Sequence, residues 1–230
     1  IYTYIKQAFP NVPIVDISDY YTRHIEPAKR IYQGKPPWRT VTNSGIKKKS
    51  RPRAMTNMAK VICDKLATMT FSEQCDISVD DEKYNDTVSE VLENNCFWER
   101  FPEFLSRSYA LGGGVIKVHL EDNVIRLNYI NADRFFPTKW NNRQITEGIF
   151  CNDYVQNGFY YKLFEYHTLQ SDGVHIYHVL RRSDSRSYLG QEVPVSELFP
   201  ELDYEMVFKG VQKPLFCYFK PAVGNNMVFD

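Results

Sequence analysis

The stretch FWERFPEFLSRSYALGGGVIKVHLEDNVIRLNY, residues 97–129, decides the fold. Its first half places apolar side chains three and four residues apart, which predicts an amphipathic helix over residues 97–111. Three glycines at 112–114 end that helix, and the period then changes to two. Residues 115–120 and 124–129 are therefore predicted strands, joined by the turn Glu121-Asp122-Asn123 into a β-hairpin.

Upstream of this stretch the periodicity remains helical. Ser18 is the predicted N-cap of a helix that runs to residue 32, with a break at Pro27 and an end at Gly34. Residues 34–50 are predicted to form a loop. The next predicted helix has an apolar stripe along one face, which consists of Met55, Met58, Ala59, Ile62, Leu66 and Met69. The alternating pattern of residues 75–79 predicts a short strand, and residues 81–95 are predicted to form another helix. Pro102 is expected to fit the helix over 97–111 only in its first turn.

Downstream of residue 129 the pattern indicates antiparallel strands. They are predicted near residues 144–154, 159–169, 174–182 and 206–211, with Asn157-Gly158 and Asp172-Gly173 at turns. Strands that follow one another in sequence usually pair with each other. The predicted fold class is therefore α+β: N-terminal amphipathic helices over residues 14–111, packed on a C-terminal antiparallel β meander over 112–220. We expect one region across residues 1–230.

The composition argues against several classes of protein. The chain has 28 Lys and Arg against 28 Asp and Glu, so bulk charge gives no argument for nucleic-acid binding. No apolar run approaches the roughly 18 residues of a membrane span. Aromatic residues make up 15% of the chain, which argues against disorder. The five cysteines lie far apart, which predicts buried or half-buried thiols in a reducing compartment rather than disulfides or a zinc site.

The sharpest charge feature is a basic run that consists of Lys47, Lys48, Lys49, Arg51 and Arg53. Such a cluster can contact phosphate groups. No aromatic residues interleave with it, so stacking on single-stranded nucleic acid is not indicated. The alternative is a solvated loop that leads into the following helix. The basic run is the candidate for an assembly or nucleic-acid contact.

No motif for catalysis or cofactor binding stands out. The glycines at 112–114 lie between a helix and a strand, which is the wrong order for a phosphate-binding loop. Glu165 and His167 share one face of a predicted strand, as an acid–base pair or as a structural pair on a surface strand. His175 and His178 point to opposite faces of a strand, so they do not share a metal. We therefore predict no enzyme, no cofactor and no metal.

Several segments resemble, in the same order, the portal proteins of tailed phages. The central one is Asn131-Ala132-Asp133-Arg134-Phe135-Phe136-Pro137, followed by Trp140-Asn141-Asn142 and Ile145-Thr146-Glu147. The other matching segments are Met58-Ala59-Lys60, Ala67, Phe71-Ser72-Glu73, and residues 110–117, 160–167, 189–190 and 214–226. Together they cover nearly the whole chain, and they are similar to the subgroup from long-tailed phages and prophages of Gram-positive bacteria.

The resemblance implies a structural subunit. Portal subunits form a ring, usually of twelve copies, at one capsid vertex, and DNA is packaged and later ejected through it. The implied partners are other copies of the chain, terminase, scaffold, major capsid and head-completion proteins, and the double-stranded DNA in the channel, with no membrane. The implied location is the virion, with the host cytoplasm during assembly.

The resemblance also implies a fragment. The chain corresponds to the N-terminal, wing-containing part of a portal subunit, without stem, clip and crown, so no channel-lining residue is identified. On this interpretation the run from Lys47 to Arg53 contacts a neighbouring subunit or the capsid, because a surface along which DNA slides should not be strongly basic. Two other classes stay open. One is a nucleic-acid-processing enzyme that uses Glu165 and His167, with the basic run gripping phosphates; the other is a cytoplasmic interaction module without a phage role.

Overall fold

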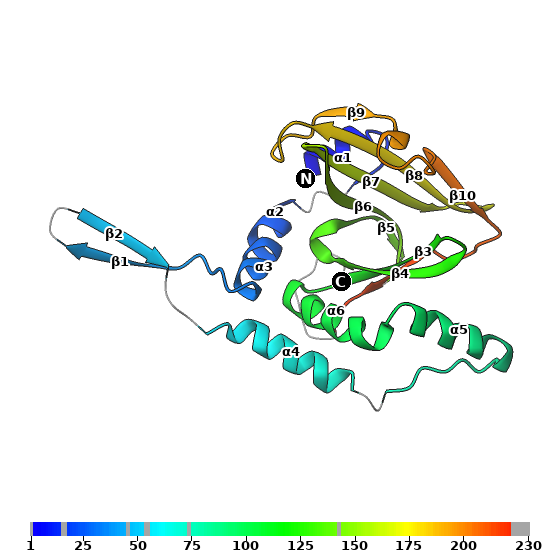
Figure 1. Cartoon of the computed structure of the whole chain (residues 1–230), viewed down its shortest axis with the longest axis horizontal. Coiled ribbons are helices and arrows are strands. Elements are labelled where there is room, and N and C mark those ends of the chain that lie inside the picture. The colour runs from blue at the N-terminus through cyan, green and yellow to red at the C-terminus, as the bar shows by residue number, and fades with distance from the viewer. Residues whose placement is uncertain are drawn as a thin grey trace.

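The computed structural model describes residues 2–14, 18–44, 47–52, 56–72, 75–141 and 144–221, with the backbone alone within 39–44 and 47–52. Most helices precede most strands along the chain (Figure 1). The helical segments are α1 (Tyr2–Ala8), α2 (Ser18–Tyr20), the π-helical turn η1 (Tyr21–Ile25), α3 (Glu26–Tyr32), α4 (Met58–Thr70), α5 (Glu82–Asn94), α6 (Phe97–Leu111), and the 3-10 turns η2 (Ala132–Arg134) and η3 (Val195–Glu197). The strands are β1 (Arg39–Ser44), β2 (Lys47–Pro52), β3 (Gly114–Glu121), β4 (Val124–Asn131), β5 (Phe135–Asn141), β6 (Gln144–Gln156), β7 (Phe159–Leu169), β8 (Gly173–Ser183), β9 (Gln191–Val193), β10 (Glu205–Lys209) and β11 (Phe216–Phe219).

The predicted helix from Ser18 to residue 32 is present, divided into α2, η1 and α3. The π-helical turn lies next to Pro27, which has no N–H to donate to the carbonyl four residues back. A widened turn is a common way for a helix to accommodate a missing bond of this kind. Gly34 follows the helix at φ +71°, in the left-handed conformation that glycine adopts without strain.

Helix α4 is present as predicted, and its apolar stripe is largely exposed. Only Ala67 of this helix is buried, whereas Met58 and Ile62 are each 53% exposed and Met69 is 82% exposed. The reason lies in α6, which turns its aromatic side to the small sheet and meets α4 through polar groups. Within the described ranges, the stripe therefore stays largely exposed. Met55 lies outside the described residues.

Helices α5 and α6 match their predicted ranges. The position of Pro102 and the segment before α5 differ from the prediction. Asp81 caps α5 by accepting a hydrogen bond from the N–H of Lys83. Pro102 lies in the second turn of α6 rather than in the first, because burial of the aromatic side chains along this helix outweighs one lost hydrogen bond. The predicted strand at 75–79 is wrong: these residues have no strand partner, and the side chain of Asn85 binds the N–H of Val79 instead.

The C-terminal strands form two antiparallel sheets rather than one continuous meander. The larger sheet has the order β10-β8-β7-β6-β5, with β9 also on β8, and the smaller has the order β11-β3-β4. The predicted hairpin of β3 and β4 is confirmed, with Asp122 and Asn123 at positive φ in its two-residue turn. Strands β5, β9 and β11 have no counterpart among the predicted strands.

The predicted loop over 34–50 is wrong for residues 39–44 and 47–50, which belong to β1 and β2. The β-branched run Thr40-Val41-Thr42 favours an extended backbone, and the two strands pair antiparallel from Arg39 opposite Pro52 to Ser44 opposite Lys47. Within the described part of the chain, this hairpin pairs with no other strand. It projects from the rest of the molecule (Figure 1).

The larger sheet packs against other elements on both of its faces. Successive residues of a strand point to opposite faces, so neighbouring residues enter different clusters. In β6, Ile149 faces the cluster that contains Ile5 of α1, and the next residue, Phe150, faces Phe216 of the smaller sheet. Helix α6 covers the far side of the smaller sheet, where Phe104 is fully buried. This arrangement of helices on antiparallel sheets confirms the α+β class.

Candidate functional site

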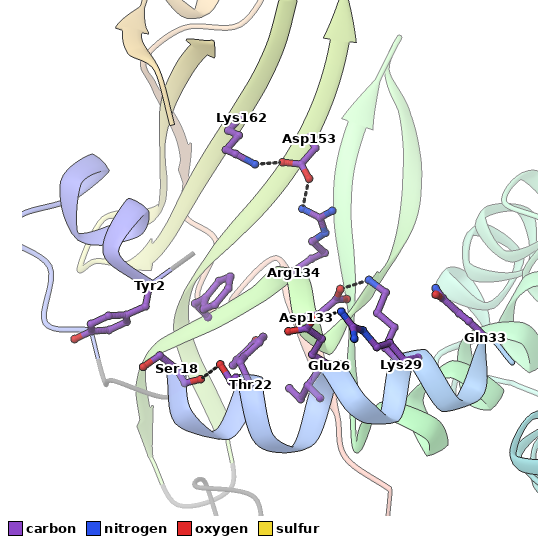
Figure 2. A pocket seen from close by; sticks show the side chains of 14 residues that line it. Tyr2, Ser18, Thr22, Glu26, Lys29, Gln33, Asp133, Arg134, Asp153 and Lys162 are labelled. Carbon is purple, nitrogen blue, oxygen red and sulfur yellow. Dashed lines mark hydrogen bonds and ion pairs between the residues drawn. The ribbon is translucent and has the colours of Figure 1, made fainter. Parts of the chain in front are cut away.

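A pocket of about 480 Å³ lies between the N-terminal helices and the larger sheet (Figure 2). Its charged side chains meet there in ion pairs. Arg134 binds the carboxylate of Asp153 at 2.7 Å, and Lys162 binds the same carboxylate at 2.8 Å. Lys29 of α3 pairs with Asp133. These contacts join α3, η2, β6 and β7 around one cavity.

The cations of this pocket already have anionic partners. Burial alone would raise the pKa of Asp153, but hydrogen bonds from Lys162 and Arg134 hold the pKa of that carboxyl below its ordinary value. Each of the four Lys and Arg side chains that line the pocket forms an ion pair. An anionic ligand would have to displace a carboxylate, so the geometry favours a structural link over a binding site.

Tyr21 fastens the N-terminal helices to the sheet next to this pocket. Its hydroxyl donates to the backbone carbonyls of Ala132 and Phe135, and its ring stacks on Phe136 with centroids 5.0 Å apart. Burial is the main cause that raises the pKa of Tyr21, so the hydroxyl keeps its proton. The segment from Ala132 to Phe136, which carries the central part of the sequence resemblance, is thus a packing and anchoring element.

A buried ion pair joins the two sheets. The Nζ of Lys117 in β3 lies 2.6 Å from Oε2 of Glu165 in β7, and both residues are buried. Asn152 donates from Nδ2 to Oε1 of the same carboxylate at 3.0 Å. The Lys117 ammonium also lies 5.4 Å from the ring centroid of Phe150. The carboxylate is therefore neutralised and hydrogen-bonded within the core.

Glu165 and His167 do share a strand face, as predicted, but the prediction of a surface position is wrong. His167 is 2% exposed and Glu165 is 8% exposed, because the smaller sheet covers this face of β7. His167 Nε2 lies 3.6 Å from Glu165 Oε2. The Lys117 charge overcomes the effect of burial and holds the pKa of Glu165 well below its usual range. Burial lowers the pKa of His167, so the ring is neutral near pH 7.

This geometry favours a structural role for the pair over acid–base catalysis. A general base must reach a substrate proton, whereas both side chains are enclosed between the sheets. Sequence reasoning missed Lys117, which completes the cluster. The available signal was its position two residues after Val115 in a strand, which places both side chains on the same inward face.

The five residues of the basic run divide between a strand and a part of the chain that is not described. Lys47, Lys48, Lys49 and Arg51 belong to β2, and Arg53 lies outside the described residues. The solvated loop expected here is replaced by an antiparallel hairpin that projects from the rest of the molecule (Figure 1).

The cysteines form no disulfide, and two of them depart from the predicted burial. Cys96 and Cys217 are exposed, because Cys96 occupies a left-handed turn before α6 and Cys217 lies on the edge strand β11. Burial raises the pKa of the Cys151 thiol to about 11. In the described ranges, no group of three or more His, Cys, Asp and Glu side chains is placed to hold a metal ion. No helix within those ranges has the length and apolarity needed to cross a membrane.

Comparison with known proteins identifies the family of the chain, which the geometry alone does not show. A search of curated proteins finds no match. A family model described as "Phage portal protein, SPP1 Gp6-like" matches residues 12–213, from the loop after α1 to the segment before β11. The match includes both sheets, apart from β11, and the projecting hairpin. Because it spans most of the sequence, the chain belongs to the family of SPP1 Gp6-like phage portal proteins.

Proposed function

We propose that this chain is the wing-containing part of a portal subunit. Copies of that subunit form a ring through which double-stranded DNA is packaged and ejected and to which the tail is joined. Membership of the portal family gives the chain a structural role in the capsid of a bacteriophage. The family match over residues 12–213 is the observation that carries the proposal. The proposed ring contains about twelve subunits, as the resemblance to portal proteins implies.

The proposed partners follow from this position at the capsid vertex. They are neighbouring copies of the chain, the terminase that drives packaging, scaffold, major capsid and head-completion proteins, and the DNA in the channel. We assign the chain to the wing-containing part of the subunit, and to the subgroup from long-tailed phages and prophages of Gram-positive bacteria. The enclosed positions of Lys117, Glu165 and His167 suit a rigid assembly part, because these side chains stabilise the core between the two sheets.

The basic run is proposed as an assembly contact rather than a DNA site. Four of its five residues lie on a hairpin that projects from the body, where it can reach another protein. A portal has to let DNA slide, and phosphate contacts from clustered Lys and Arg would hold the DNA in place.

The test uses the full-length gene product, produced alone and together with its scaffold. Native mass spectrometry and negative-stain microscopy should show a closed ring of about twelve copies with a central channel. In the phage, a nonsense mutation in the gene should yield heads without DNA. Heads that fill with DNA in the absence of the protein would contradict the proposal, as would a chain that stays monomeric with scaffold present.

A further inference from the structure

Charge is segregated along this chain, although its net charge is zero. Residues 35–53, which include β1 and β2, contain seven Lys or Arg and no Asp or Glu. Residues 76–99, which include α5, contain eight Asp or Glu and one Lys. We call these two stretches the basic arm and the acidic segment. Their formal charges are therefore +7 and −7.

Within the described part of the chain, no Lys or Arg forms an ion pair with the carboxylates of the acidic segment. Its eight carboxylates are all exposed, and they are Asp76, Asp80, Asp81, Glu82, Asp86, Glu90, Glu93 and Glu99. Like charges spaced along one helix repel each other, so a cationic partner would stabilise this surface.

The two strands within the basic arm, β1 and β2, form a two-stranded sheet of their own. Strand β1 pairs with β2 and with no other strand of the described chain, so each has an outer edge without a neighbour. A two-stranded hairpin without a covering surface is marginally stable in water. The arm is therefore suited to docking on another surface.

The basic arm and the acidic segment lie at opposite ends of the subunit. Figure 1 shows the hairpin of β1 and β2 at one end of the longest axis and α5 at the other, with α4 between them. A single copy cannot bring its own hairpin onto its own α5 in this arrangement. Helix α4 lies between the two charged ends (Figure 1). Its side chains Met58, Ile62 and Met69 are exposed, so a neighbour that spans the two ends would cover apolar surface.

We propose that the basic arm of one subunit docks on the acidic segment of the next subunit in the ring. This inference rests on the proposed ring function, and it names the surfaces that meet. Each subunit gives an arm at one end and receives one at the other, which is a head-to-tail contact of the kind that closes into a ring. The equal and opposite charges within one chain favour a second copy over DNA as the occupant.

Two charge-reversed versions of the full-length chain test this docking. The arm variant carries Glu in place of all five residues of the basic run, which changes the arm from +7 to −3. The segment variant carries Lys at Asp76, Asp80, Asp86, Glu90 and Glu93, which changes the acidic segment from −7 to +3. The matched control carries Glu at five exposed cations outside the basic arm, the acidic segment and α4: Lys6, Arg23, Arg186, Lys209 and Lys213.

Each variant alone should lose at least about tenfold of its ring fraction at 0.15 M salt, measured by mass photometry, because like charges then face each other. The control should form rings as the wild type does. An equimolar mixture of the two variants should recover rings to within about twofold, since each arm then meets a segment of opposite charge. Recovery on mixing also shows that both variants fold.

The other outcomes separate this inference from the proposed function. If both variants form rings in the same fraction as the wild type, the docking is overturned, whereas the proposed ring function stands. An arm variant that forms normal rings but no longer binds a 30-base-pair duplex in fluorescence anisotropy would assign the arm to DNA and overturn the docking. A wild-type chain that stays monomeric with scaffold would overturn the ring function, and the docking with it.

Discussion

The two-sheet body buries its large apolar side chains, whereas the peripheral helix α4 leaves most of its apolar side chains exposed. Phe104 and Phe150 of the body are fully buried, whereas Met69 of α4 is 82% exposed. Both regions have amphipathic sequences, so the pattern alone does not separate them. The difference teaches that the body carries the stability of the subunit, while the periphery presents apolar and charged surface that the subunit itself does not use.

The largest expected effect comes from truncation in the body. Phe150→Ala removes a ring that packs on Phe135, Phe216 and His167 between the two sheets. We expect a loss of about 3–5 kcal/mol in the free energy of unfolding, from lost burial and the cavity left behind. Urea denaturation followed by circular dichroism measures it. A loss below about 1 kcal/mol would place the core elsewhere.

Breaking the buried ion pair should have a similar or slightly smaller effect. Lys117→Met leaves the Glu165 carboxylate buried without its cation, which costs about 3–5 kcal/mol when one partner of a buried pair is removed. The double variant Lys117→Met with Glu165→Leu should recover most of that loss, because it removes both charges. Equal destabilisation of the single and double variants would show that the charges are not coupled.

Acid should weaken the body in two steps. Burial is the main cause that lowers the pKa of His167 below the ordinary value of 6.5, so the unfolded chain binds the extra proton first and stability falls as the pH drops below 6.5. The pKa of Glu165 is also lowered, from an ordinary value of 4.5, so its contribution is lost as the pH falls below 4.5.

The pH dependence of the free energy of unfolding, measured between pH 8 and 4, checks this expectation. His167→Gln should flatten the slope between pH 6.5 and 5, because Gln does not titrate there. His178 contributes a slope of the same sign, since burial lowers its pKa as well. A slope between pH 6.5 and 5 that His167→Gln leaves unchanged would contradict the assignment of the His167 ring as neutral.

The smallest effect is expected on α4. Replacing Met58, Ile62 and Met69 by Gln should change the free energy of unfolding of the monomer by less than about 0.5 kcal/mol per residue, because these side chains are already in water. Thermal unfolding of the monomer gives the value. A loss comparable to that of Phe150→Ala would mean that the stripe is covered within the subunit.

Local signals explain which parts of the fold were predictable. The helix over 97–111 and the hairpin that follows it depend on glycines and on Asp122-Asn123, whose effects act within a few residues. Strand β11 and the hairpin of β1 and β2 are formed by pairing with another strand. The sequence of a short polar or aromatic segment does not indicate such pairing. The orientation of α4 was not predictable from its sequence, because an amphipathic pattern identifies an apolar face without identifying the surface that covers it.

The candidate site was predictable in part for the same reason. The strand period places Glu165 and His167 on one face, and it also places Lys117 beside Val115. The contact between these two strands crosses from one sheet to the other, and no local pattern states which sheets face each other. The basic run was evident as a charge cluster, but its position at one end of the molecule required the fold.

Hydrogen exchange of the monomer and of the assembled ring tests the central claim most directly. That claim is that the body is stable within one subunit, whereas the basic arm becomes stable only when it docks on a neighbouring subunit. We expect amides of β6, β7 and β8 to be equally protected in both forms, because these strands lie within the larger sheet. Amides of β1 and β2 should exchange rapidly in the monomer and at least about tenfold more slowly in the ring. Exchange of β1 and β2 that assembly leaves unchanged would contradict this account.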